Sequence, residues 1–349
     1  MYQDNLIAID LSKNSFQGSL LDKHHRECFN RKFTRNKLIE WLSRQQPLSV
    51  AMEACGSAHH WARLVERMGH RPLLVPTRTV TRYREGHKTD ATDATDALAT
   101  GVAARQPKTR FVAPKTIEQQ GMQGVDRIRE HISDHLTATS NMIRSLLYEF
   151  GLTIPKGISA FKRKVVEILE DAENDLPMAL RMQLIESWEY YLDLEVRLKT
   201  AKRARDQIVA QHEPCQQLIH LQGVGPVNAL CLYLCLGDRG TSFTNGRETS
   251  TCIGLTPKQY STGGEVTMIG ISKKCANKRL RSTLIQGARA VINVLRKRDP
   301  RNGMEAWLKS LIARRGEGRA AVALANKTVR LAWAMLHYGE DFKIHPDMA

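Results

Sequence analysis

The stretch "NLIAIDLSKNSFQGSLLD", residues 5–22, decides the fold of the N-terminal part of the chain. Its apolar run from Leu6 to Ile9 is bounded by polar residues, which predicts a buried strand. The segment "NSFQGSLLD" that follows predicts a turn and a second strand. Asp10 ends the first strand, where a charged side chain is costly to desolvate unless it is paired or binds a cation.

The next segments extend this strand pair into an α/β domain. Four elements follow in order: a short helix in "KLIEWLSRQ" (37–45), a strand in "PLSVAMEACG" (47–56), an amphipathic helix in "SAHHWARLVERMGH" (57–70) and a strand in "RPLLVPT" (71–77). The order β-β-α-β-α-β indicates a mixed sheet. We expect this domain to span residues 1–115 and to close near "TRFVAP", residues 109–114.

Three aspartates lie close together in "HKTDATDATDALAT", residues 87–100. Asp90, Asp93 and Asp96 are each three positions apart, and "LATGVAA" continues the segment as a helix. This spacing puts them on nearly one helix face. A plainer interpretation is that Thr89 caps the helix and that the helix dipole favours acids in its first turn.

Asp10 and Glu53 end two strands, so we expect their carboxylates to enter one cleft together with these aspartates. Carboxylates that converge in this way repel each other unless divalent cations neutralise them. Mg²⁺ prefers oxygen ligands, and two ions about 3.5–4 Å apart can stabilise both oxygens of a phosphodiester displacement. The alternatives are that Asp10 only starts a turn and that Glu53 pairs with a nearby arginine.

The remainder of the chain is predicted to be mainly helical. Apolar residues recur at helical spacing from Ile117 to Phe150 and again from about Leu180 to His212. The two helices, within a region 116–212, would form either an antiparallel hairpin or a dimer interface. The third region, 213–340, contains "LIHLQGVGPVNALCLYLCLG", where Gly223 and Gly225 resemble a helix-hairpin-helix turn whose backbone amides contact a DNA phosphate.

Positive charge points to a nucleic-acid partner. The formal net charge is +16 over 349 residues, and residues 270–330 alone contain sixteen Lys and Arg against three acids. The sequence shows neither a signal peptide nor an apolar run long enough for a membrane span, so we expect no membrane partner. Its seven cysteines lack zinc-site spacing and fit reduced thiols in a cytoplasmic protein.

Several motifs carry a family resemblance, in the same order along nearly the whole chain. They are "AIDLSKNSF", "AMEACGSAHHWA", "GHKTDATDA", "TRFVAPKT", "GVGPVNA" and "IGLTPKQYSTGG…GISKK". These segments resemble insertion-sequence transposases of the DEDD class. The resemblance implies an RNase H-like (RuvC-like) N-terminal domain and a C-terminal transposase half that bears a serine. It also implies a DNA recombinase that moves its own element, guided by a non-coding RNA from that element.

The resemblance assigns the acids residue by residue. Asp10 matches the first acid of the family and Glu53 the second. The pattern Lys-Thr-Asp-x-x-Asp-Ala gives Asp90 and Asp93 as the last two catalytic and metal-binding acids. The "DAT" unit is doubled here, and counting back from "TRFV" favours Asp93 and Asp96, which leaves Asp96 as the reserve.

The family places a nucleophilic serine just before a glycine of "LTPKQYSTGG", residues 255–264. Ser261 is our choice, because its hydroxyl is less hindered than that of Thr262, the reserve; the other interpretation of "STGG" is an ordinary turn. The resulting hypothesis is a composite site in which Ser261 attacks a metal-polarised phosphate, with the acids and the serine meeting across subunits of a dimer or tetramer. The basic side chains expected at phosphates are Lys273, Lys274, Arg279 and Arg281.

Two other functions stay open at this point. One is a RuvC-like, structure-specific endonuclease that uses metal-activated water and leaves Ser261 as a bystander. The other is a nucleic-acid-binding protein without catalysis, in which the acids are dispensable.

Overall fold

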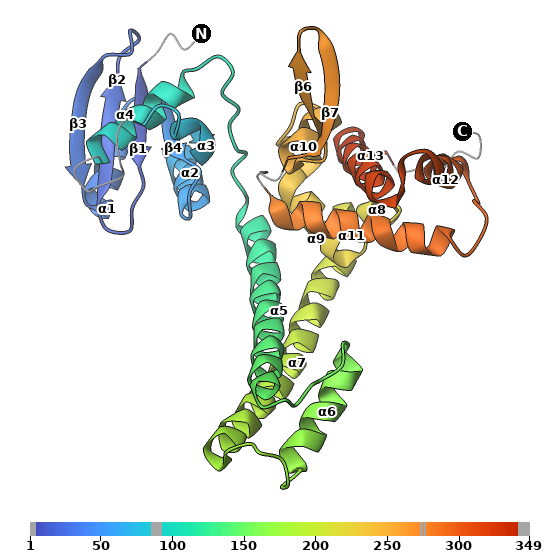
Figure 1. The fold of residues 1–349 in the computed structure, drawn as a ribbon. Coiled ribbons are helices and arrows are strands. Elements are labelled where there is room, and N and C mark those ends of the chain that lie inside the picture. The colour runs from blue at the N-terminus through green and yellow to red at the C-terminus, as the bar shows by residue number, and fades with distance from the viewer. Residues whose placement is uncertain (1–4, 85–92, 273–274, 276, 341–349) are drawn as a thin grey trace. The chain divides into compact units, whose positions relative to one another are not determined.

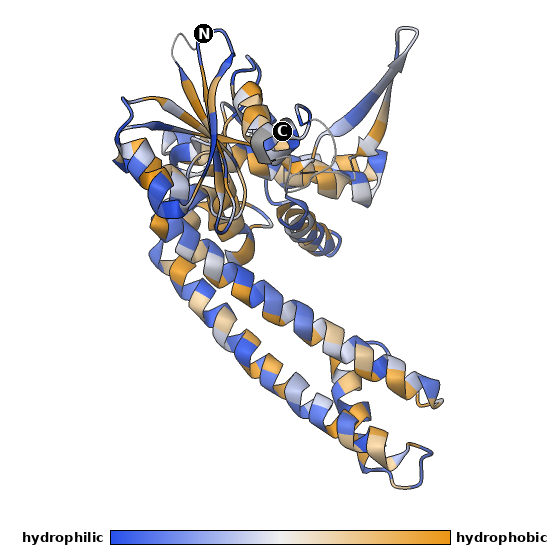
Figure 2. Ribbon diagram, turned by 90° about the vertical axis from the view of Figure 1, so that its left-hand side faces the viewer, coloured by the Kyte–Doolittle hydropathy of each residue, from blue (hydrophilic) through white to orange (hydrophobic). Residues whose placement is uncertain are grey.

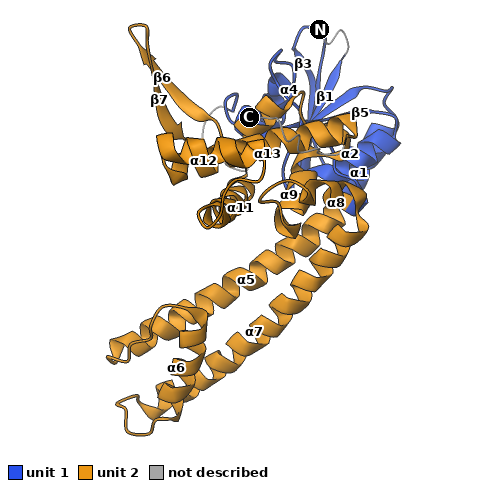
Figure 3. Cartoon of the chain, turned by 90° about the vertical axis from the view of Figure 1, so that its right-hand side faces the viewer, with its two compact units in different colours: residues 1–118 blue, residues 119–349 orange. Residues whose placement is uncertain are grey.

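The computed structural model describes residues 5–84, 93–272, 275 and 277–340. The chain forms two compact units, residues 1–118 and residues 119–349, shown in blue and orange in Figure 3. Each unit is described by itself below. Among the described residues, no helix combines the length and the apolar character that crossing a membrane requires.

Unit 1 is built on a five-stranded sheet with the order β3-β2-β1-β4-β5 (Figure 1). Its strands are β1 (Leu6–Asp10), β2 (Phe16–Leu21), β3 (Glu27–Phe33), β4 (Ser49–Glu53) and β5 (Arg71–Val75). The first three strands are antiparallel neighbours, whereas β4 runs parallel to both β1 and β5. The sequence therefore predicted the mixed α/β sheet correctly.

Helices cover both faces of this sheet, and the strand alternation decides which residues meet them. The helices are α1 (Arg35–Ser43), α2 (Ala58–Arg67), α3 (Thr77–Val80) and α4 (Asp93–Ala104). Ile7 and Ile9 pack in one cluster with residues of α1 and α2. Leu6 and Ala8 pack in another cluster with Ala99 of α4 and its neighbours. Residues with even numbers in β1 thus face α4.

The strand β3 was absent from the sequence prediction. Its residues, "ECFNRKF", are mostly exposed or half-buried, and only Phe33 is buried. An edge strand of this kind carries charged side chains and lacks the apolar alternation that identifies a half-buried strand. Pairing with β2 forms it despite its polar sequence.

Unit 2 begins with three helices, α5 (Ile117–Glu149, whose first two residues belong to unit 1), α6 (Ile158–Glu170) and α7 (Met178–Gln211). The sequence predicted α5 and α7 but not α6. Ile143 of α5, Phe161 of α6 and Leu184 of α7 belong to one buried cluster. Hydrophilic and hydrophobic residues alternate along both long helices (Figure 2), and Ile128 and Val196 stay 61% and 65% exposed.

The remainder of unit 2 is a helical bundle with one projecting hairpin. Its elements are α8 (Glu213–Ile219), α9 (Pro226–Leu236), η2 (Asp238–Gly240), α10 (Gly246–Ile253), β6 (Pro257–Thr262), β7 (Glu265–Ile271), α11 (Lys278–Leu295), α12 (Gly303–Arg315) and α13 (Glu317–Tyr338). One core unites α8, α9 and α10 to α13 and includes Leu230, Leu284 and Leu324. Every residue of β6 and β7 except Ile271 is exposed, so this hairpin is held by its own ladder.

Candidate functional site

Two acids lie side by side at the C-terminal ends of two adjacent inner strands of the unit 1 sheet. The parallel register pairs Ile9 of β1 with Met52 of β4, so Asp10 and Glu53 are the next residues of adjacent strands. Met52 packs on the α1–α2 side and Ala51 on the α4 side. Alternation then directs both acids toward the side of the sheet that α4 covers.

A third acid comes to this place from α4. Asp96 is only 1% exposed, in the first turns of a helix that lies across the sheet (Figure 1). The close approach of α4 depends on Gly101, because a Cβ there would lie 2.6 Å from Leu21 Cδ1 and 3.1 Å from Ala8 Cβ. Small residues on α4 therefore bring the Asp96 carboxylate down to the strand ends.

Arg84 joins two of these acids. Its Nε donates to Asp96 Oδ1 at 2.6 Å and its Nη2 donates to Glu53 Oε2 at 3.0 Å. The side chains are 13% exposed for Arg84, 11% for Glu53 and 1% for Asp96. Burial without water strengthens these charge-assisted hydrogen bonds and makes the loss of any partner costly. The alternative that Glu53 pairs with an arginine is thus realised.

The sequence around Arg84 contains a signal for this ion pair. "TRYREGHK", residues 81–88, puts three basic side chains just before the aspartates. A cation run next to an acid run favours an internal ion pair when both enter the interior. Only the tertiary structure shows which of these side chains reaches the acids.

The other predicted acids are described only in part. Asp90 lies outside the described residues, and so does the side chain of Asp93, although Asp93 is the first residue of α4. Asp93 and Asp96 are three positions apart on the same helix and therefore share a face. Of the aspartates in this segment, it is the reserve candidate, Asp96, that meets Glu53 through Arg84.

The acids fit a divalent cation in the type of ligand that they offer. Carboxylate oxygens are the ligands that Mg²⁺ prefers, and Asp96 Oδ2 is buried without a hydrogen-bond partner among the described residues. A positive group, the Arg84 guanidinium, already lies between two of the carboxylates. No three His, Cys, Asp or Glu side chains in the described part of the chain come close enough to hold an ion as they stand.

The candidate nucleophile lies in unit 2, on the β6–β7 hairpin. Gly263 and Gly264 form its two-residue turn with φ of +60° and +88°, the left-handed region that glycine favours. Ser261 is in the strand just before this turn, is exposed, and accepts a hydrogen bond from Gln259 Nε2 at 2.7 Å. Thr262 follows it and pairs with Glu265 at the end of the ladder.

The glycines of the predicted helix-hairpin-helix turn have different roles. Gly223 has φ of +76°, and a Cβ on it would lie 2.8 Å from the backbone of Gly287 in α11. The need for close packing therefore explains Gly223 without a phosphate. Gly225, the N-cap of α9, has open space around its Cα and stays a candidate for backbone contact.

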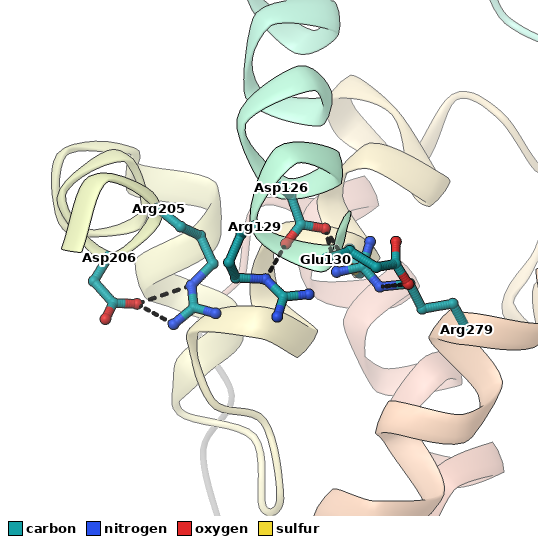
Figure 4. A network of polar contacts seen from close by, with 7 residues as sticks. Asp126, Arg129, Glu130, Arg205, Asp206 and Arg279 are labelled. Atoms are coloured by element: carbon teal, nitrogen blue, oxygen red, sulfur yellow. Dashed lines mark hydrogen bonds and ion pairs between the residues drawn. The ribbon is translucent and has the colours of Figure 1, made fainter. Parts of the chain in front are cut away.

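Two of the predicted phosphate-binding residues are already engaged inside unit 2. Figure 4 shows Arg279 beside two carboxylates of α5: its Nη2 lies 2.6 Å from Asp126 Oδ2 and its Nε 2.8 Å from Glu130 Oε1. Arg281 donates to the carbonyl oxygen of Ser272. These partners weaken the expectation that the two arginines contact phosphate. Lys273 and Lys274 lie outside the described residues.

The same network holds a buried thiol. Cys231 lies 3.6 Å from Asp126 Oδ2, and burial, followed by the negative charge of Asp126, raises its pKa to about 12. Burial likewise raises the pKa of Cys215 to about 12. Both thiols are therefore protonated near neutral pH and unreactive, as the sequence predicted for buried cysteines, but Cys28, Cys55 and Cys252 are exposed and do not follow that prediction.

Comparison with known proteins gives the family of this chain. Residues 7–151 match a DEDD transposase domain of the IS110 type, and residues 215–301 match the transposase IS116/IS110/IS902 family. The chain is 34% identical to the transposase for insertion sequence element IS1328 of Yersinia enterocolitica, over 97% of this chain and 98% of that protein. It is 36% identical to a probable family 20 transposase of Pseudomonas aeruginosa, over 95% and 96% of the two chains.

A third relative, the transposase for insertion sequence element IS1111A of Coxiella burnetii, is 34% identical over 97% of this chain and 91% of its own. The two family matches follow each other along the chain, and the first continues from unit 1 into unit 2. The chain therefore belongs to the IS110/IS116 family of transposases.

Proposed function

We propose that this transposase cuts and rejoins the DNA ends of an insertion sequence through an acidic site in unit 1 and a serine in unit 2. The single observation that carries the acidic site is the meeting of Glu53 and Asp96 at Arg84, beside Asp10 on the neighbouring strand. The strand order of unit 1 and its match to a DEDD transposase domain support an RNase H-like fold.

In this proposal the acids are Asp10, Glu53, Asp93 and Asp96. Asp96 takes the place of Asp90, the choice from the motif, because Asp96 is buried and shares Arg84 with Glu53. Two bound Mg²⁺ ions would supply positive charge that polarises the scissile phosphate. Arg84 offsets part of the negative charge of Glu53 and Asp96.

The chemical step is a displacement at phosphorus. The Ser261 Oγ forms a bond to phosphorus while one phosphorus–oxygen bond of the DNA backbone breaks, and the released deoxyribose oxygen takes a proton. The second DNA end then displaces the serine and restores the backbone. Because the serine–phosphate bond keeps the energy of the broken phosphodiester bond, the DNA can be rejoined without an external energy source.

Assembly and guidance complete the proposal. The exposed apolar side chains of Ile128 and Val196 on α5 and α7 support a homo-oligomer formed through these helices. From the family resemblance we also propose that a non-coding RNA of the element selects the donor and target sites.

Trapping a covalent adduct tests the nucleophile. The protein is incubated with Mg²⁺, the element ends and the flanking RNA, and the products are separated under denaturing conditions. We expect a protein–DNA adduct that disappears in Ser261→Ala and persists in Thr262→Ala. The opposite pattern would refute Ser261, and DNA cleavage without any adduct would favour an endonuclease that uses water.

A matched pair of aspartates tests the acidic site in the same assay. We expect Asp96→Asn to abolish strand cleavage while DNA binding persists, and Asp90→Asn to retain cleavage. If Asp90→Asn abolishes cleavage and Asp96→Asn does not, our assignment of the acids is wrong. Cleavage that survives Asp10→Asn and Glu53→Gln together would refute the acidic site, whereas DNA binding without any cleavage by the wild type would leave only a nucleic-acid-binding function.

A further inference from the structure

Unit 2 contains a cleft that neither the family matches nor the proposed function assigns. It encloses about 1570 Å³, larger than the roughly 300–1,000 Å³ of small-molecule pockets. Its walls come from α10, the base of the β6–β7 hairpin, α12 and α13. Among the described residues, five cations and no acid line it: Arg247, Arg315, Arg319, Lys327 and Arg330. We refer to it as the cationic cleft.

The helices present these cations in stripes. Arg319, Lys327 and Arg330 are eight and three positions apart, so they fall on one face of α13. Arg315 lies on α12 eight positions after Trp307, which also lines the cleft. The α13 helix begins beside the cleft, at Glu317, and the positive end of its dipole adds to the field.

The cationic cleft lacks internal counter-charges. None of its five cations forms an ion pair with a carboxylate within the described part of the chain, and Lys327 Nζ instead lies 4.6 Å from the centre of the Trp307 ring. Nearby acids are already engaged, because Glu317 pairs with Arg296 and Glu305 with Arg298. A folded cavity lined by like charges is unfavourable unless an anion enters it, so the site is suited to a polyanion.

The hairpin connects this cleft to Ser261. Pro257 and Met268 line the cleft. The ladder pairs Gln259 with Met268 and Ser261 with Val266, so Ser261 shares a hairpin face with Met268. Thr262 projects from the opposite face, away from the cleft.

We propose that the cationic cleft holds the sugar–phosphate backbone of the DNA strand whose phosphate Ser261 attacks. This inference rests on the proposed function of Ser261, and it adds the binding surface of the attacked strand. Arginine suits the task because its guanidinium donates two parallel hydrogen bonds to a phosphate. Contacts to phosphate position a strand without reading its sequence, so binding in the cleft tolerates different element ends.

Binding of labelled single-stranded DNA to the full chain, followed by fluorescence anisotropy, tests the inference without catalysis. We expect the double variant Arg319→Gln/Arg330→Gln to bind about tenfold more weakly and to lower the slope of log affinity against log salt by about 1.4. The matched control is Lys202→Gln/Arg203→Gln on the exposed surface of α7, which removes the same charge and should leave both quantities near the wild type. Arg319→Lys/Arg330→Lys, which keeps the charge, should recover the slope.

Each outcome separates the cleft from the nucleophile. If Arg319→Gln/Arg330→Gln keeps the wild-type affinity and slope, or the α7 control loses as much, the cleft does not bind the strand. Cleft-dependent binding of RNA alone, with DNA of the same sequence unaffected, also overturns the assignment to DNA. If binding depends on the cleft but the wild type forms no adduct, the role of Ser261 fails while the cleft stands as a DNA site. If Arg319→Gln/Arg330→Gln forms as much protein–DNA adduct as the wild type, the cleft does not hold the attacked strand, while the role of Ser261 stands.

Discussion

Replacing Arg84 by methionine isolates the electrostatics of the acidic site. Methionine keeps much of the volume and removes the guanidinium that joins Glu53 to Asp96. The two carboxylates are only 11% and 1% exposed, so the variant leaves two buried acids without their cation. Removing one member of a buried ion pair costs about 3 kcal/mol or more.

This loss translates into a measurable fall in melting temperature. Unit 1 spans 118 residues, a size at which each kcal/mol shifts the melting temperature by about 3–5 °C. In EDTA, differential scanning calorimetry of Arg84→Met should therefore show the transition of unit 1 lowered by about 10 °C. Excess Mg²⁺ should raise the melting temperature more in Arg84→Met than in the wild type, where a cation has to displace the guanidinium.

The control for this variant is Arg44→Met in the same unit. Arg44 pairs with Glu40 on α1, but these side chains are 73% and 58% exposed, so the loss should be at most about 1 kcal/mol. Equal melting temperatures for the two variants would refute the view that Arg84 compensates buried charge. A Mg²⁺ response that is the same with and without Arg84 would separate this arginine from the cation site.

Two further predictions concern the bundle of unit 2. Gly287→Ala should destabilise the chain by about 1–3 kcal/mol in urea unfolding, because the new Cβ would lie 2.0 Å from the carbonyl oxygen of Gly223. The control, Gly121→Ala, adds a Cβ in open space within α5 and should stabilise the chain by up to about 1 kcal/mol. Equal effects of the two variants on the free energy of unfolding would contradict the close packing at Gly287. Hydrogen bonds from Arg298 hold the pKa of Glu305 below its usual 4.5, so its stabilisation is complete above that pH and is lost as the pH falls through the lower folded value. Glu305→Gln should then lower stability at pH 7 but converge with the wild type in strong acid, and a constant difference across the pH range would exclude this linkage.

Local sequence patterns accounted for the framework of both units. The apolar run Leu6–Ile9 and the acid that ends it identified β1, and the helical periodicity of α5 and α7 identified the long helices. The strand β3 was not predicted because it is a polar strand at a sheet edge. The helix α6 was overlooked, although Phe161, Val165 and Ile168 recur in it at helical spacing.

For the candidate site, too, the sequence indicated some features and the tertiary structure decided others. Sequence alone indicated which residue types gather: carboxylates after strands, a serine before glycines, and an excess of positive charge toward the C-terminus. These follow from covalent order and from short-range preferences, which any segment carries with it. Only the tertiary structure decided that Asp96 meets Glu53 through Arg84, and that Ser261 rather than Thr262 shares a hairpin face with the lining of the cationic cleft. Both outcomes depend on which segments pack together and on strand register, and a change of one residue in register would exchange the two faces.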